Sequence, residues 1–205
     1  MKRITVVIAT RNRGKVDEIR ELLNGYDADI RTLEDFVPVP EVAEKGKSFK
    51  ENALIKAVFT AKALGLPAIA DDSGLVVDAL NSAPGIYSAR YAGEGATDLE
   101  NNLKLLKELE GVKDRNARFE TTVAIALPGG EHLTYSGRVE GIILESPEGE
   151  MGFGYDPLFF YPPFKKTFAQ MTNHEKNQIS HRRMAFKNLI GEFVGIAAWI
   201  RELDR

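Results

Sequence analysis

The chain has 205 residues, 43% of them hydrophobic and 28% charged, as expected for a globular protein long enough to bury a core. Its formal net charge of -3 argues against broad nucleic-acid binding driven by phosphate neutralisation. The absence of cysteine excludes disulfides, thiolate metal sites and a cysteine nucleophile, and it fits a reducing cytoplasm. No apolar run reaches the roughly 18 residues of a membrane span, so we expect no membrane segment.

The first predicted elements are a strand, a polar loop and a helix. Ile4–Ala9 is apolar but is soon followed by polar residues, which favours a first strand over a signal peptide. The loop Thr10–Lys15 leads into a helix that ends at Gly25, and a short strand is expected around Ile30. The inward face of the helix is predicted to consist of Val16, Ile19, Leu22 and Leu23. Such a loop aims backbone N–H groups at an anion and adds the charge of Lys15, although a plain turn between strand and helix explains it equally well.

An acidic, irregular segment, Glu41–Lys47, precedes the second predicted helix. Ser48 and Glu51 have the spacing of a capping box, so Glu51 has a structural reason to be present and is a poor candidate for metal binding. Glu41 and Glu44 lack such a reason, and either could reach a cation or remain solvated in a loop. The helix is predicted to end at Gly65 and to pack through Leu54, Ala57, Val58, Ala61 and Leu64.

Two apolar runs, Leu66–Ala70 and Leu75–Leu80, flank the polar residues Asp71–Gly74. A short buried strand that ends in adjacent carboxylates would deliver acidic oxygens to a sheet edge, and Mg²⁺ prefers such oxygens. The alternative is a polar turn that joins two core segments, with Asp and Gly selected for turn geometry.

The next elements are a turn, a helix and a β-hairpin. Asn81–Gly85 turns the chain, and Thr97 with Glu100 forms a second capping box. The helix behind this cap is predicted to end at Gly111 and to pack through Leu99, Leu103, Leu106 and Leu109. The hairpin is predicted to consist of the strands Arg118–Leu127 and His132–Val139, the turn Pro128–Gly130 and the extended continuation Ile142–Leu144.

The segment Gly152–Pro157 places Phe153 between two glycines, ahead of a predicted strand at Leu158–Tyr161. Glycines let the backbone approach a ligand closely, and a Phe held between them can present its face to a planar base. The alternative is a bulged strand with a core Phe.

The last predicted helices carry a group of cationic side chains. Thr172 and Glu175 cap a short helical segment, and Ile179–Arg183 opens the final helix. Cations near a helix N-terminus oppose the helix dipole, which suggests an anionic or carbonyl-bearing partner, although a solvated basic turn is the alternative. The donors concerned are Lys176, His181, Arg182 and Arg183. The apolar residues of the final helix include Ala185, Leu189, Ile190, Phe193, Val194, Ala197, Trp199 and Ile200.

The order of these elements predicts an α/β fold with a mixed central sheet layered by helices. The chain alternates strands and helices in its first half, then becomes rich in strands, then helical. Each polar segment suits a different chemical group. The loop Thr10–Lys15 suits phosphates, and Glu44 with Asp72 suits a divalent cation. The segment Gly152–Asp156 suits a flat base, and Lys176–Arg182 suits a carbonyl or phosphate oxygen. A nucleoside triphosphate with Mg²⁺ requires all four.

At these residues the sequence closely resembles the inosine triphosphate pyrophosphatase family. The shared motifs run in order over nearly the whole chain, and jointly they are specific. They are Thr10-x-Asn12-x-x-Lys15, Glu51-Asn52-Ala53, Ala70–Gly74, Pro84–Arg90, Gly152–Pro157 and Ser180-His181-Arg182. One departure is Arg183, where family members often carry a small residue.

The resemblance implies a single domain over residues 1–205, with two lobes flanking a deep substrate cleft, and a homodimer in the cytoplasm that binds neither nucleic acid nor membrane. It implies Mg²⁺-dependent hydrolysis of the purine nucleoside triphosphates ITP, dITP and XTP to the monophosphate and pyrophosphate, which removes deaminated purines from the nucleotide pool. The implied catalytic residue is Asp72, and the metal ligands are Glu44 and Asp72, with Glu41 as an alternative to Glu44. The implied substrate-binding residues are Thr10, Arg11, Asn12, Arg13, Gly14, Lys15, Ser73, Phe153, Gly154, Tyr155, Asp156, Lys176, His181 and Arg182.

A mechanism follows from these assignments. A cation held by Asp72 and Glu44 would acidify water and withdraw charge from the phosphates, and Asp72 could orient or deprotonate the attacking water. Lys15 and Lys176 would offset charge on the pyrophosphate leaving group. His181 and Arg182 would donate to the 6-carbonyl of inosine or xanthosine, which adenine lacks.

Two other functions remain open at this point. A Maf-like pyrophosphatase would have a related sheet and a different base preference. A nucleotide sensor without catalysis would bind ITP and Mg²⁺ but release no pyrophosphate, although Asp72 and the acidic segment argue against it.

Overall fold

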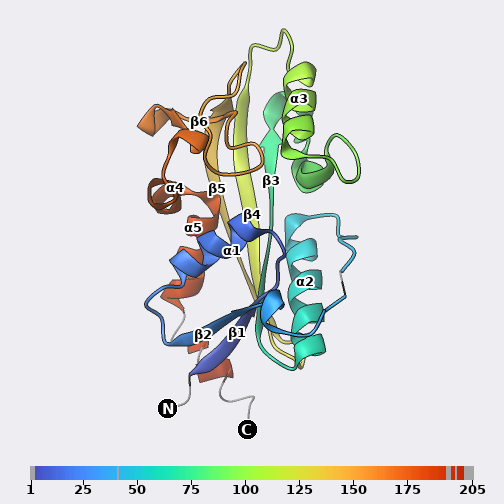
Figure 1. Cartoon of the computed structure of the whole chain (residues 1–205), viewed down its shortest axis with the longest axis vertical. Helices are drawn as coiled ribbons and strands as arrows, with labels where there is room; N and C mark the ends of the chain where they lie inside the picture. The colour runs from blue at the N-terminus through green and yellow to red at the C-terminus, as the bar shows by residue number, and fades with distance from the viewer. Residues whose placement is uncertain (1–2, 41, 193–194, 197, 201–205) are drawn as a thin grey trace. The chain divides into compact units, whose positions relative to one another are not determined.

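The fold is α/β, with a mixed seven-stranded sheet in the order β2-β1-β3-β4-β5-β6-β7. The computed structural model describes residues 3–40, 42–192, 195–196 and 198–200 (Figure 1). Strand β1 pairs in parallel with β2 and β3, whereas β6 pairs antiparallel with β5 and β7, which confirms the predicted mixed sheet. The strands are β1 Ile4–Ile8, β2 Ala28–Thr32, β3 Ala68–Val77, β4 Asn116–Ala126, β5 His132–Ile143, β6 Phe159–Tyr161 and β7 Lys166–Thr167. The α-helices are α1 Arg13–Leu22, α2 Phe49–Leu64, α3 Asp98–Glu108, α4 Asn173–Ile179 and α5 His181–Gly191.

The described residues divide into two compact units. Unit 1 comprises residues from 1–72, 121–137 and 182–205, and unit 2 comprises residues 73–120 and 138–181. Strands β3, β4 and β5 contribute residues to both units. The organisation as a single domain with a deep cleft stays a prediction.

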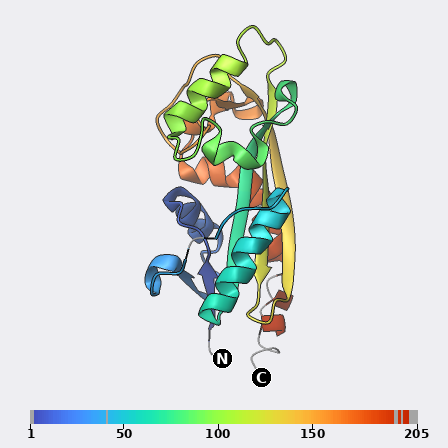
Figure 2. The ribbon, with the colours of Figure 1, turned by 90° about the vertical axis from the view of Figure 1, so that its right-hand side faces the viewer.

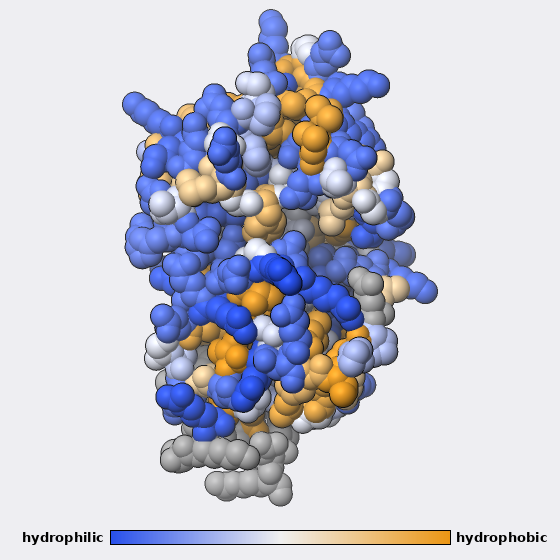
Figure 3. All heavy atoms as spheres, in the orientation of Figure 1, coloured by the Kyte–Doolittle hydropathy of each residue, from blue (hydrophilic) through white to orange (hydrophobic). Residues whose placement is uncertain are grey.

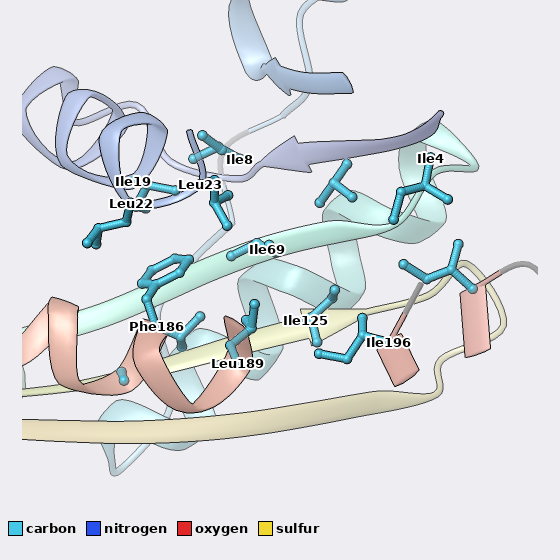
Figure 4. Packing of buried hydrophobic residues seen from close by; sticks show 14 of the residues in the cluster. Ile4, Ile8, Ile19, Leu22, Leu23, Ile69, Ile125, Phe186, Leu189 and Ile196 are labelled. Atoms are coloured by element: carbon cyan, nitrogen blue, oxygen red, sulfur yellow. The ribbon is translucent and has the colours of Figure 1, made fainter. Parts of the chain in front are cut away.

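Unit 1 packs helices against both faces of its part of the sheet. On one face, α1 and α5 cover the strands through a cluster of large aliphatic residues around Ile8, Ile69 and Phe186 (Figures 1 and 4). Of the predicted inward residues, Ile19, Leu22 and Leu23 belong to this cluster, and Val16 is partly buried against it. On the other face, α2 packs through Ala57 and Ala61 against alanines of β3 and β4, and small side chains let the helix approach the sheet closely.

Helix α2 begins as its sequence predicts. Ser48 is the N-cap, and its side chain accepts a hydrogen bond from the backbone N–H of Glu51. The Glu51 carboxylate accepts from the backbone N–H of Lys47, at 2.7 Å. Glu51 therefore serves the start of the helix, as expected, and Gly65 closes the helix in the left-handed conformation.

Unit 2 has a core of its own, rich in aromatic residues. Phe159 and Phe168 pack edge to face at 4.8 Å between ring centroids, and Phe119 stacks on Phe168 at 5.7 Å. Leu105 of helix α3 and Leu109, the C-cap residue of that helix, belong to this core.

The prediction that a strand ends at the adjacent carboxylates is wrong. Strand β3 runs without a break through Asp71, Asp72, Ser73 and Gly74 to Val77. The strand tolerates two buried carboxylates because each pairs with a cationic side chain: Asp71 with Lys15 and Asp72 with Lys56. The polar residues therefore lie within a strand rather than in a turn.

The predicted inward face of α3 is wrong for two of its four leucines. Leu99 is 67% exposed and Leu103 is 57% exposed, whereas Leu109 is buried and Leu106 is partly buried against the core. The capping box of Thr97 and Glu100 is confirmed. The buried residues of the helix are Asn101 and Leu105, so its inner face differs from the predicted one.

Helices α4 and α5 begin where the sequence predicts. Thr172 and Glu175 form the capping box of α4, and α5 starts at His181. Ile200 is buried in the core of unit 1, and Trp199 packs against it. The predicted core residues Phe193, Val194 and Ala197 lie outside the described residues.

On the face drawn in Figure 3, hydrophilic residues predominate and hydrophobic side chains form separate groups. Among the described residues, no helix combines the length and the apolar character that crossing a membrane requires.

Candidate functional site

The loop between β1 and α1 forms a well-capped helix N-terminus in unit 1. Asn12 is the N-cap of α1, and its side chain accepts from the backbone N–H of Lys15 at 3.0 Å. The backbone N–H of Asn12 donates to the hydroxyl of Thr10, and Arg11 donates to the carbonyl of Val39 at 2.5 Å. Arg13 and Gly14 open the helix. The N–H groups of this first turn and the positive end of the helix dipole can hold an anion.

Four charged side chains meet at this helix: Glu18, Asp71 and Arg182 are buried, and Lys15 is partly buried. The ammonium of Lys15 lies 3.1 Å from a carboxylate oxygen of Asp71, and the Arg182 guanidinium donates to Asp71 and to Glu18. Two cations and two anions balance, so burial of these charges is tolerable. Burial lowers the pKa of Lys15, and the nearby Asp71 carboxylate only partly offsets this. The Arg182 side chain is 1% exposed and contacts the two carboxylates rather than solvent.

Asp72 belongs to a second polar cluster of unit 1. Its carboxylate accepts from the Lys56 ammonium at 3.0 Å and from the Asn52 amide at 3.2 Å. The same ammonium lies 2.6 Å from a carboxylate oxygen of Glu44. Burial raises the pKa of Asp72, and the Glu44 carboxylate adds to the rise, while Lys56 and Lys15 act against it. For Lys56, burial lowers the pKa, but the surrounding carboxylates outweigh it and leave the pKa above its ordinary value.

Asn52 also fixes the segment that carries Glu44. Its side-chain oxygen accepts from the backbone N–H of Gly46 at 2.8 Å, while its amide nitrogen donates to Asp72. A Cβ at position 46 would lie 2.5 Å from this oxygen, so only glycine allows the approach. One amide therefore links the acidic segment to β3.

The donor set around Asp72 suits Mg²⁺. The Lys56 ammonium occupies a position between Glu44 and Asp72 that a cation can share with two carboxylates. Within the described part of the chain, no group of three or more His, Cys, Asp or Glu side chains could hold a metal ion. Mg²⁺ usually takes one or two carboxylates and completes its shell with water and substrate phosphates, so two carboxylates are sufficient.

In unit 2, the loop that carries Phe153 is organised around Asp156. One carboxylate oxygen of Asp156 accepts from the backbone N–H of Phe153 at 2.9 Å and from the Lys176 ammonium at 2.6 Å. The Lys176 ammonium also lies 4.6 Å from the centre of the Phe153 ring. Lys176 is buried against Asp156. The role predicted for Lys176 at the leaving group stays a prediction.

The remaining predicted residues have defined surroundings. The ring of His181 stacks on Phe119 at 5.0 Å, and both belong to unit 2. The Tyr155 hydroxyl donates to the carbonyl of Ser88 at 2.8 Å, and burial raises the pKa of this Tyr. Ser73 lies within β3, next to Asp72.

Three residues with direct contacts to these clusters were not singled out for the site from the sequence: Glu18, Asn52 and Lys56. Asn52 and Lys56 are four residues apart on α2, and that spacing places them on one face of the helix. Lys15 and Glu18 are likewise three apart on α1. Helical spacing could therefore have placed the members of each pair on one face of their helix. It does not reveal which strand that face of the helix contacts.

Comparison with known proteins identifies a family over most of the chain. The Ham1 family model matches residues 6–192. A dITP/XTP pyrophosphatase from Desulfotalea psychrophila is 53% identical over 197 residues, which cover 96% of this chain and 88% of that protein. A dITP/XTP pyrophosphatase from Geobacter sulfurreducens is 54% identical over 182 residues, 88% of this chain and 92% of that protein.

Solved structures agree with the fold. A Ham1 protein from Staphylococcus aureus superposes with a TM-score of 0.84 at 43% identity, over 93% of this chain and 98% of that one. A HAM1 protein from Coxiella burnetii gives a TM-score of 0.85 at 42% identity, over 94% of this chain and 99% of that one.

Proposed function

The chain belongs to the Ham1 family, and from that premise we propose that it is a nucleoside triphosphate pyrophosphatase acting on dITP, XTP and ITP. It releases the nucleoside monophosphate and pyrophosphate, and so removes deaminated purines from the nucleotide pool. The observation that carries the proposal is the cluster of Asp72, Glu44 and Lys56, where a buried carboxylate of raised pKa shares a cation with a second carboxylate.

Asp72 is the group that activates water. A carboxylate whose pKa is raised by burial is a better proton acceptor than an exposed one, because a general base works best when its pKa approaches the working pH. The Asn52 amide and the Lys56 ammonium fix the orientation of this carboxylate. Asp72 therefore orients the attacking water at the α-phosphorus and accepts its proton.

Mg²⁺ fits the same cluster. Glu44 and Asp72 would hold it, in place of the contact that both now make with Lys56. The alternative ligand, Glu41, lies outside the described residues. When bound, the ion withdraws charge from the phosphates.

The triphosphate is held by the residues at the start of α1. The loop Thr10–Asn12, with Arg13 and Gly14, presents backbone N–H groups and the positive helix end. Lys15 offers a cation whose charge is balanced by Asp71 when no phosphate is bound. Ser73, beside Asp72, completes the proposed phosphate contacts.

Recognition of the purine belongs to unit 2. Phe153 stacks on the base, while Gly154, Tyr155 and Asp156 shape the loop around it. Lys176 lies against the Phe153 ring, and we assign it to the base rather than to the leaving group. His181 donates to the 6-carbonyl of the purine.

Arg182 is proposed as a second donor to this carbonyl. In the structure its guanidinium is buried against Glu18 and Asp71, so contact with a base requires that the side chain become accessible.

We also propose that the protein is a homodimer of the cytoplasm, a compartment that suits a chain without cysteine.

The decisive experiment is a pyrophosphate-release assay on dITP, XTP, ITP, ATP, GTP, dTTP and UTP, with Mg²⁺ and with EDTA. We expect pyrophosphate from dITP, XTP and ITP, slow turnover of ATP, and no turnover in EDTA. Faster cleavage of dTTP or UTP would indicate the Maf-like preference. Tight binding of ITP without turnover would indicate a sensor, and release of orthophosphate would contradict the proposal outright.

The role of Phe153 is tested by Phe153→Ala, with Phe164→Ala as the matched control on an exposed aromatic side chain. Loss of base stacking costs about 1–3 kcal/mol, so KM for dITP should rise about five- to 150-fold. The control should leave KM unchanged. An unchanged KM in Phe153→Ala would show that this Phe only fills space.

A further inference from the structure

Helix α3 directs two polar side chains, one helical turn apart, at the loop that carries Phe153. Asp98 opens α3, and Asn102 follows four residues later on the same face. Helix α3 is the light green helix in Figure 2, and the loop belongs to the orange segment in the same unit. Neither residue was singled out by the sequence motifs that indicated a function.

Both side chains bond to the backbone of one residue, Gly154. The Asp98 carboxylate accepts from the N–H of Gly154 at 2.7 Å, and the Asn102 amide donates to the carbonyl of Gly154 at 2.9 Å. One helix therefore holds the peptide groups on both sides of Gly154. The residue has a φ of +61°, which glycine adopts without strain.

These contacts determine how Phe153 is presented. The N–H of Phe153 donates to Asp156 at 2.9 Å, and the next N–H along the chain, that of Gly154, donates to Asp98. Two consecutive N–H groups thus bond to two different carboxylates. The backbone on both sides of the Phe153 side chain is fixed, so the ring can vary mainly through its own side-chain torsions.

The Asn102 side chain is costly if its only purpose is folding. Its oxygen Oδ1 is buried and has no hydrogen-bond partner among the described residues, and an unsatisfied buried acceptor lowers stability. The Asn102 side chain bonds through its amide to the carbonyl of Gly154. The same helix exposes two leucines, Leu99 and Leu103. Helix α3 therefore has apolar side chains at exposed positions, while the polar Asn102 faces the loop.

We propose that Asp98 and Asn102 are positioning residues for base recognition, which clamp Gly154 and thereby hold Phe153 in the geometry that stacks on a purine. This inference rests on the proposed function, because it assigns the two residues to the binding of the same base. It adds a part of α3 that does not itself touch the ligand.

The test separates base binding from phosphate binding. Steady-state kinetics on dITP with Mg²⁺ are measured for Asp98→Ala and Asn102→Ala, together with inhibition by inorganic tripolyphosphate, which carries no base. We expect KM for dITP to rise about tenfold with kcat changed less than about twofold, and the inhibition constant of tripolyphosphate to stay unchanged. A parallel rise in both constants, or no rise in KM, would overturn the proposal.

Two further variants guard against a merely structural effect. Asp98→Asn keeps a side-chain oxygen that can accept from Gly154 and should restore KM to near the wild-type value. Asn102→Asp replaces the donor by an acceptor facing the Gly154 carbonyl and should raise KM more than Asn102→Ala does. Lys107→Ala, at an exposed position of α3, is the control and should behave as wild type. Failure of Asp98→Asn to rescue would contradict the clamp.

Hydrogen exchange of the Gly154 amide distinguishes failure of the clamp from failure of the proposed function. This amide should exchange faster in Asp98→Ala than in the wild type and Lys107→Ala. If the wild type releases no pyrophosphate from dITP or XTP, the proposed function fails and the assignment to base recognition fails with it. An unchanged exchange rate in Asp98→Ala would overturn the clamp whatever the substrate.

Discussion

Arg182 has carboxylate partners within the protein that its place in the sequence does not reveal. A basic residue at the start of a helix opposes the dipole, so the sequence indicated an external anion or carbonyl. In the structure the compensating carboxylates belong to the protein itself, Glu18 on α1 and Asp71 on β3. They are far from Arg182 in the sequence, which is why local pattern could not identify them.

We expect Arg182→Met to destabilise the protein strongly. Removing one partner of a buried ion pair leaves uncompensated charge, at a cost of about 3–5 kcal/mol. Equilibrium urea unfolding measures the loss. Lys187→Met, at an exposed position of α5, is the control and should change stability by less than about 0.5 kcal/mol. Equal stability of the two variants would show that the buried cluster contributes little.

The proposed role of Asp72 gives a second prediction. Asp72→Asn preserves shape and the potential to bond to Lys56, but it removes the proton acceptor. We expect kcat to fall by roughly 10²–10⁴ while the fold persists. Pyrophosphate release and circular dichroism measure the two outcomes. A kcat near that of the wild type would refute the role of general base.

At the scale of elements, helix α3 shows that a pattern of leucines does not by itself identify the buried face of a helix. The capping box of Thr97 and Glu100 placed the start of the helix correctly. The buried face contains Asn101, Leu105 and Leu109, whereas the predicted Leu103 is exposed. Polar residues can face inward when they find partners, and the amide oxygen of Asn101 accepts from the backbone N–H of Ala92 at 2.8 Å.

Paired substitutions on α3 test this corrected face. Leu105→Ala should lower the free energy of unfolding by about 2–5 kcal/mol, because it leaves a cavity in the core of unit 2. Leu103→Ala, which removes the same atoms from an exposed position, should cost less than about 1 kcal/mol. Urea unfolding under conditions that keep the protein monomeric gives both values. A larger loss of unfolding free energy in Leu103→Ala than in Leu105→Ala would support the buried face that was predicted from the sequence.

The cap of α4 gives a prediction on pH. The hydrogen bond from Lys166 and those from Thr172 lower the pKa of Glu175 from 4.5 to about 2. A carboxyl group with a depressed folded-state pKa stabilises the protein above its unfolded pKa and loses this contribution as pH falls towards the folded value. We therefore expect Glu175→Gln to be less stable than the wild type at about pH 7, with the difference shrinking between about pH 4.5 and pH 2.

Urea unfolding of both proteins over this range measures the difference. Glu150→Gln, at an exposed position, serves as the control for the loss of a charge. A constant difference between Glu175→Gln and the wild type at all pH values would show that the carboxylate charge is not involved.

At the scale of the whole molecule, the mixed sheet joins a parallel part, β2-β1-β3, to an antiparallel part, β5-β6-β7. The α/β class was predictable because apolar strands alternate with capped helices in the first half, while a hairpin follows in the second. The order of the strands was not predictable from pattern, since β3 follows α2 in the sequence but lies next to β1 and β4.

Binding of the phosphate chain should stabilise the folded protein as a whole. A ligand that binds only the folded state adds RT ln(1 + [L]/Kd), or about 2.7 kcal/mol at 100 times Kd. We expect inorganic tripolyphosphate with Mg²⁺ to raise the Tm of the wild type in a concentration-dependent way. The rise in Tm should be smaller for Lys15→Met. Lys62→Met, on an exposed part of α2, is the control. No shift of Tm at saturating ligand would contradict the phosphate site.

The sequence by itself determined the family, the α/β class, the helix caps and the residues expected to carry chemistry. It could do so because capping, periodicity and ordered motifs depend on residues that are neighbours along the chain. Only the tertiary structure decided that β3 continues through Asp71 and Asp72, that Lys56 lies between Glu44 and Asp72, and which side of α3 is buried. These outcomes depend on which distant charges and side chains meet, because a buried polar group adopts the conformation in which its partners satisfy it.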